Sequence, residues 1–148
     1  MFKATGIHPF HVFMTVRIIF SALIAPALIY LSSVVVVMIG WYDRYRWLDN
    51  PYHVAGGASI AFLFWILIQT KPAWKKILET ERLLSFGLLV GFTAVVAIFW
   101  EVYEMLYDII YRTQVQGGVR DNVTDLVLGL FGSAVAAWYL LRKSNRCG

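Results

Sequence analysis

Three carboxylates in one short segment are the first sign of chemistry in this sequence. Glu101, Glu104 and Asp108 are spaced i, i+3 and i+7, which places them on one face of a helix. Several carboxylates in a low-dielectric setting cannot all ionise, so they share protons, pair with cations or bind a metal. The pattern indicates a polar site, and its alternative is a set of interhelical salt bridges at a wet interface.

Two further pairs of ionisable residues share the spacing i, i+4. Asp49 precedes His53, and Asp121 precedes Asp125, although Asp121 is also placed to cap a helix. Carboxylates with one imidazole suit a divalent ion such as magnesium, manganese, iron or zinc. The candidate metal ligands are Asp49, His53, Glu101, Glu104, Asp121 and Asp125. The candidate catalytic residues are Glu101, Glu104 and Asp125.

The composition says which elements position these groups. Of 148 residues, 59% are hydrophobic and 15% are charged, whereas a soluble domain is nearer half apolar and a quarter charged. A bilayer core of roughly 30 Å needs about 20 apolar residues in a helix. The segments that meet or approach this length are 18–40, 53–70, 83–111 and 122–141. We therefore predict an all-α, integral membrane four-helix bundle that forms a single transmembrane domain over residues 1–148.

The same composition excludes other classes of protein. One cysteine, Cys147, cannot build a disulfide scaffold, and the hydrophobic content excludes disorder and a basic nucleic-acid module. The net charge of +4 is better explained by membrane topology. We expect no nucleic-acid partner and expect contact with membrane lipids.

The basic residues predict the orientation of the bundle. The predicted loops divide the 13 lysines and arginines into nine on the side of both termini and four on the other. The positive-inside rule therefore predicts cytoplasmic N- and C-termini. The nine are Lys3, Arg17, Lys71, Lys75, Lys76, Arg82, Arg142, Lys143 and Arg146. The four are Arg44, Arg46, Arg112 and Arg120, of which the last two are candidate partners for the acids.

Helical rise predicts that the acids from separate segments meet at one depth. Glu101 lies 18 residues after Leu83, and Asp125 lies 16 residues before Leu141. These separations correspond to about 27 Å and about 24 Å, close to the outer edge of the hydrocarbon. Small residues continue the same faces, which predicts that these faces pack together. They are Gly56, Gly57, Gly87, Gly91, Gly129 and Gly132.

These motifs together resemble those of a known family. They are Asp49-x-x-x-His53-x-x-x-Gly57, Trp100-Glu101 with Glu104, and Asp121-x-x-x-Asp125 followed by Gly129 and Gly132. Over residues 41–140 the chain resembles the YjdF-like family of bacterial inner-membrane proteins. It is more distantly similar to the VanZ-like family associated with teicoplanin resistance. The resemblance implies an inner-membrane location and supports the bundle and the site, but it supplies no reaction.

Three functions remain open, and whether the protein is an enzyme stays undecided. The first is a metal-assisted hydrolase or transferase that acts at the periplasmic or extracellular face on lipid headgroups or envelope precursors. The second is a non-catalytic small subunit or binding module of a larger membrane complex or homo-oligomer. The third is a proton or cation transporter, which the uncharged cytoplasmic halves of the segments disfavour.

Overall fold

Helices make up most of the part of the chain that the structure describes. The computed structural model describes residues 9–144, except for the side chains of residues 9–16, 43, 73, 79 and 144. It is 90% helical, has no strand within the described residues, and contains four helices long and apolar enough to cross a membrane. The predicted all-α membrane fold is therefore confirmed. Lys3, Arg146 and Cys147 lie outside the described residues.

The long helices begin earlier than the hydrophobic segments do. They are α1 (Pro9–Met38), α3 (Asp49–Gln69), α5 (Arg82–Tyr111) and α6 (Val119–Ser144). Proline is well suited to the first turn of a helix, which accounts for the start of α1 at Pro9 rather than residue 18. Because α3 starts at Asp49 rather than residue 53, this carboxylate lies in the first turn, where the helix dipole favours a negative charge.

Short helices join the long ones. Between α1 and α3 lie α2 (Trp41–Arg44) and the 3₁₀ helix η1 (Arg46–Leu48). The connection between α3 and α5 contains α4 (Pro72–Thr80), a helix that the hydropathy pattern did not predict. It is amphipathic: Leu78 is buried under it, whereas Trp74 and Lys76 are exposed. It packs across one end of the bundle against α3, α5 and α6.

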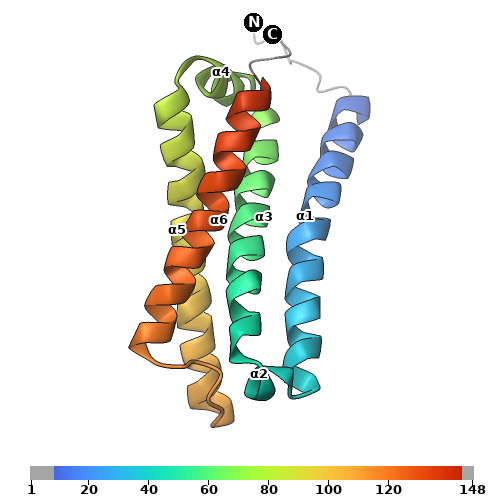
Figure 1. Cartoon of the computed structure of the whole chain (residues 1–148). Helices are drawn as coiled ribbons and strands as arrows, with labels where there is room; N and C mark the ends of the chain where they lie inside the picture. Colours follow the sequence, from blue (N-terminus) through green and yellow to red (C-terminus); the bar gives the residue numbers. More distant parts are fainter. Residues whose placement is uncertain (1–8, 145–148) are drawn as a thin grey trace, which may run out of the picture.

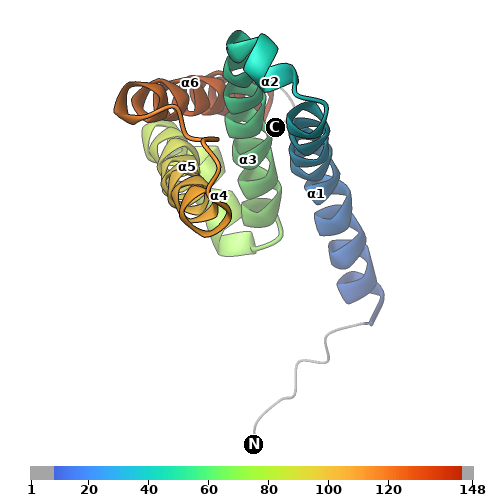
Figure 2. The ribbon, with the colours of Figure 1, turned by 90° about the horizontal axis from the view of Figure 1, so that it is seen from below.

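The long helices alternate in direction (Figure 1). The start of α1 and the end of α6 lie at the end of the bundle that carries α4. The end of α1, the start of α3, the end of α5 and the start of α6 lie at the opposite end. Figure 2 shows α3 between α1 and the α5–α6 pair, with α1 standing to one side. Helix α1 also touches α5, because the Tyr30 ring packs edge-on against Trp100 at 5.7 Å.

The apolar core lies at the α4 end. It contains residues from α3, α4, α5 and α6, which are Ile68, Leu78, Leu89, Ala137 and Leu141. Leu89 is fully buried at its centre. One turn further along α5, the hydroxyl of Ser133 donates a hydrogen bond to Thr93 Oγ1 at 3.0 Å and ties α6 to α5.

Glycines bring α3 and α6 into backbone contact. A Cβ at Gly57 would overlap the carbonyl oxygen of Gly129, and one at Gly132 would overlap the carbonyl oxygen of Val54. Small residues let transmembrane helices approach this closely. The prediction that the glycines of α5 share this role is wrong, since a Cβ at Gly87 or Gly91 would meet no atom within 4 Å. Gly56, beside Gly57, is equally open.

Candidate metal centre

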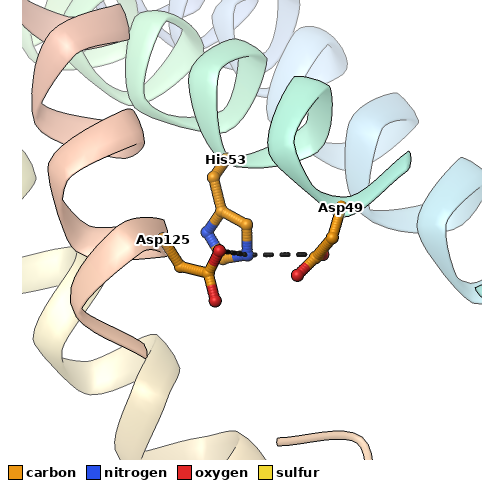
Figure 3. A group of neighbouring side chains, drawn as sticks. All are labelled: Asp49, His53 and Asp125. Carbon is orange, nitrogen blue, oxygen red and sulfur yellow. Dashed lines mark ion pairs between the residues drawn. The ribbon is translucent and has the colours of Figure 1, made fainter. Parts of the chain in front are cut away.

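Three predicted ligands converge at the end of the bundle opposite α4. Asp49 and His53 come from the first turns of α3, and Asp125 comes from α6 across the glycine contact (Figure 3). His53 Nε2 lies 3.4 Å from Asp49 Oδ1 and 3.6 Å from Asp125 Oδ1. One ligand atom from each residue lies within 4.8 Å of the others. We call these three candidate ligands the metal triad.

Burial leaves one oxygen of the metal triad short of a partner. Asp125 is 4% exposed, and its Oδ1 has no hydrogen bond among the described residues. A buried carboxylate oxygen without a hydrogen bond is costly, so it needs a cation or a proton. The imidazole of His53, itself partly buried between the two aspartates, is the nearest group that could supply part of that charge.

Tyr42 of α2 supports Asp49 from outside the long helices. Burial raises the pKa of its phenol, and the negative charge of Asp49 and a hydrogen bond to Asp49 raise this pKa further. The hydroxyl therefore stays protonated and serves as a donor to that carboxylate. The sequence indicates only an interfacial aromatic at this position. A donor beside a ligating carboxylate orients it, as outer partners do in metal sites.

Glu101 and Glu104 lie beside the metal triad on α5 without joining it. Glu101 is 9% exposed, and its Oε2 has no hydrogen-bond partner in the described chain. Glu104 Oε1 accepts a hydrogen bond of 2.8 Å from the indole of Trp100, one turn earlier. Both carboxylates interact electrostatically with His53 and Asp49. The structure therefore places the predicted glutamates near the cluster but outside the group of three close ligand atoms.

Asp121 is not brought into the metal triad. It is exposed in the first turn of α6, and its carboxylate lies so close to Gly117 that a side chain there would overlap it. The sequence offered a capping role for Asp121, but α6 already begins at Val119, so the carboxylate lies within the first turn and favours the start of the helix through the dipole. The nearby amide oxygen of Asn122 is buried without a hydrogen bond to any described residue.

Asp108 organises the connection from α5 to α6. Its carboxylate accepts hydrogen bonds from Thr113 Oγ1 and from the backbone N–H groups of Val115 and Gln116, at 2.7, 2.8 and 2.9 Å. These bonds fold the connection back along α5. The side chain of Gln116 then donates to the backbone carbonyl of Glu101 at 3.1 Å. Sequence reasoning missed Gln116, because it stands outside the hydrophobic segments and forms no motif.

The basic residues offered as partners do not neutralise these acids. Within the described side chains, no lysine or arginine nitrogen lies within 4.0 Å of the carboxylates of Asp49, Glu101, Glu104 or Asp125; the ion pairs of this group are those with His53. Arg112 and Arg120 are both exposed. The prediction that these two arginines compensate the acidic group is therefore wrong at ion-pair distance.

Comparison with known proteins gives a family for this architecture. No curated protein and no solved structure matches the chain. A family model described as "Predicted membrane protein (DUF2238)" matches residues 4–146, and the YjdF-like family is a DUF2238 family. Since this match covers nearly the whole chain, the protein belongs to the DUF2238 family of membrane proteins.

Proposed function

We propose that this membrane protein binds one divalent metal ion through Asp49, His53 and Asp125 and uses it on a phosphorylated lipid headgroup or envelope precursor. The observation that carries the proposal is the approach of three ligand atoms to within 4.8 Å from two helices. The ligands come from α3 and α6, the two helices whose backbones touch at the glycines. Their spacing is therefore fixed by rigid elements.

The ligand set favours a particular group of ions. Two carboxylates and one imidazole suit manganese, iron or zinc, with magnesium as the hard-ion alternative. A bound ion would polarise a phosphoryl oxygen and lower the pKa of a bound water. Tyr42 would then orient Asp49, and a carboxylate of the site would accept the proton of that water.

The proposed reaction is hydrolysis or transfer at phosphorus. In hydrolysis, the water oxygen bonds to phosphorus and the bond from phosphorus to the ester oxygen breaks. Asp125, which is buried beside His53, accepts the proton from water through its second carboxylate oxygen, Oδ2, and returns it to the leaving alcohol. In transfer, an acceptor hydroxyl takes the place of water in the same sequence.

The distribution of charge supports a location at the outer face of the inner membrane. The metal triad lies at the end opposite α4. The α4 end carries most of the basic residues of the described chain, which are Arg17, Lys71, Lys75, Lys76, Arg82, Arg142 and Lys143. By the positive-inside rule we assign that end, and with it both termini, to the cytoplasm. The finer kinship with the YjdF-like family, and the distant one with the VanZ-like family, belong to this proposal.

A second candidate function is a binding subunit of a larger complex or homo-oligomer. The exposure of α1 favours it, because Ala22 is the one residue of α1 between 17 and 38 that is buried. A transporter finds less support. Between the metal triad and the α4 end, the buried polar residues of the described chain are Ser59, Ser85, Thr93 and Ser133, which carry no charge across the membrane.

Metal binding by the purified protein tests the proposal. We expect one manganese or zinc ion per chain in elemental analysis after dialysis. His53→Ala and Asp125→Asn should each weaken the affinity by about 10–100-fold or more, because each removes a ligand. Asp121→Asn is the matched control for Asp125→Asn, since it removes the same charge one turn away and outside the metal triad. We expect it to change the affinity by less than about threefold.

Two results would contradict the proposal. A wild-type protein that retains no divalent ion removes the metal centre. An equal loss of affinity in Asp121→Asn and Asp125→Asn would show a diffuse acidic attraction instead of ligation. Release of phosphate or headgroup from lipid by the metal-loaded protein, but not by the metal-free protein, would then separate the enzyme from the binding subunit.

A further inference from the structure

The acids near the metal triad carry more negative charge than one divalent ion removes. Asp49, Asp125, Glu101 and Glu104 sum to four formal negative charges when ionised, and no described lysine or arginine lies within 4.0 Å of them. One divalent ion bound at the triad leaves two negative charges, both on the glutamates of α5. In a low-dielectric setting near the edge of a bilayer, such a pair either shares a proton or binds a cationic group.

The glutamate pair has the features of a built cation site. Glu101 is nine-tenths buried, its Oε2 lacks a partner, and its carboxylate interacts with His53 and Asp49 of the neighbouring helix. Glu104 is held in place by the Trp100 indole, whose ring packs against Tyr30 at 5.7 Å and Tyr103 at 5.4 Å. Carboxylates and aromatic rings are both groups that attract an ammonium ion.

We infer that Glu101 and Glu104, backed by Trp100, bind the primary ammonium group of an aminophospholipid whose phosphate meets the metal triad. The inference rests on the proposed function, since the phosphate site is the metal-loaded triad. A primary ammonium has three N–H donors for carboxylate oxygens, whereas a choline group has none and a glycerol headgroup has no positive charge. The expected order of preference is therefore phosphatidylethanolamine over phosphatidylcholine, and phosphatidylcholine over phosphatidylglycerol.

Lipid binding to the full-length protein in detergent tests this inference. The probes are phosphatidylethanolamine, phosphatidylcholine and phosphatidylglycerol with identical acyl chains, titrated with manganese present and followed by native mass spectrometry. We expect phosphatidylethanolamine to bind the wild type at least about tenfold more tightly than phosphatidylglycerol. Glu101→Gln and Glu104→Gln should each lower this preference to about threefold or less while retaining manganese. Glu81→Gln, the same change at an exposed site at the α4 end, should leave it intact.

The possible outcomes separate the inference from the proposed function. Equal binding of phosphatidylethanolamine and phosphatidylglycerol to the wild type would overturn the ammonium site without any variant. A second manganese ion that is lost in Glu101→Gln would also overturn it, because the two glutamates would then bind a metal ion instead of an ammonium group. Displacement of the lipid by equimolar soluble phosphoethanolamine would show that the bound ammonium group need not come from a lipid, and would overturn that part of the inference. A preference for phosphatidylethanolamine that persists in a chelator would support the ammonium site even where metal binding by the triad had failed.

Discussion

The two ends of the bundle are built on opposite principles. At the α4 end, apolar side chains from α3, α4, α5 and α6 pack together, with Leu89 fully buried among them. At the other end, carboxylates and a histidine meet, and buried oxygens of Glu101 and Asp125 have no hydrogen bond in the described chain. The first arrangement stabilises the fold, whereas the second is costly without a ligand.

This contrast shows how a small membrane protein keeps the contacts that stabilise its fold apart from the polar groups of its candidate site. Buried polar groups without partners destabilise the region that holds them, so a compensating contact is needed nearby. The glycine contact between α3 and α6 lies between the two ends and fixes the distance from His53 to Asp125. Substitutions at the apolar end should therefore change stability alone, and substitutions at the glycine contact should change stability and metal binding together.

The largest effect on stability is expected at the apolar end. Leu89→Ala removes a fully buried side chain and leaves a cavity, so we expect a loss of about 2–5 kcal/mol in the free energy of unfolding. Equilibrium unfolding in mixed micelles, followed by tryptophan fluorescence, measures it. Leu83→Ala is the matched control, because the same atoms are removed from a side chain that is 86% exposed on the same helix. A change in manganese affinity of the folded Leu89→Ala protein would contradict the separation of the two ends.

The next effect is expected at the glycine contact. Gly57→Ala pushes a methyl group into the carbonyl of Gly129, so α3 and α6 must move apart at a cost of about 1–3 kcal/mol. Because the ligands stand on both sides of this contact, manganese affinity should also fall by at least about tenfold. Gly56→Ala is the control on the adjacent residue, where the methyl group meets open space. Similar behaviour of the two variants would show that the backbone contact does not position the site.

Much of the fold was predictable because a bilayer restricts what a chain can do. Helices that satisfy their own backbone hydrogen bonds must be about 20 apolar residues long, and hydropathy detects that length directly. The nine residues of α4 fall below it, and the basic residues in their segment suggested a loop. The start of α1 was missed because the segment from Pro9 to Arg17 is helical outside the charge-free stretch.

The sequence predicted the depth of the site in the bundle, but not which acidic residues belong to it. Helical rise placed Glu101 and Asp125 at one depth, and the i, i+4 spacing paired Asp49 with His53, which the structure brings beside Asp125. Which other acids join them depends on the rotation and crossing of α5 and α6, and the spacing of residues along one helix does not contain this information. The same reason explains the outcome for Gly87 and Gly91 of α5, where an added side-chain carbon would contact no described residue.

A smaller effect is expected in the connection that closes the polar end. Asp108→Asn keeps the shape of the side chain but weakens three hydrogen bonds to residues 113–116, at a cost of about 1 kcal/mol. Limited proteolysis should cut residues 112–118 several-fold faster, while manganese affinity stays within about twofold. Thr113→Val removes one of the three bonds and should give a smaller increase in cutting. Equal cutting of wild type and Asp108→Asn would show that this carboxylate does not hold the connection.

The smallest effect is expected midway between the ends, at the Ser133–Thr93 hydrogen bond. Ser133→Ala removes a donor, yet Thr93 still donates to the carbonyl of Leu89, so no buried hydroxyl hydrogen loses its acceptor. Interhelical hydrogen bonds in membranes average about 0.6 kcal/mol, and we expect a loss of that size with unchanged manganese affinity. A double-mutant cycle with Thr93→Val isolates the coupling of the pair from the effect of each change alone. A coupling above about 2 kcal/mol would show that polar contacts in the middle of the bundle, and not the apolar end, carry the stability that the site requires.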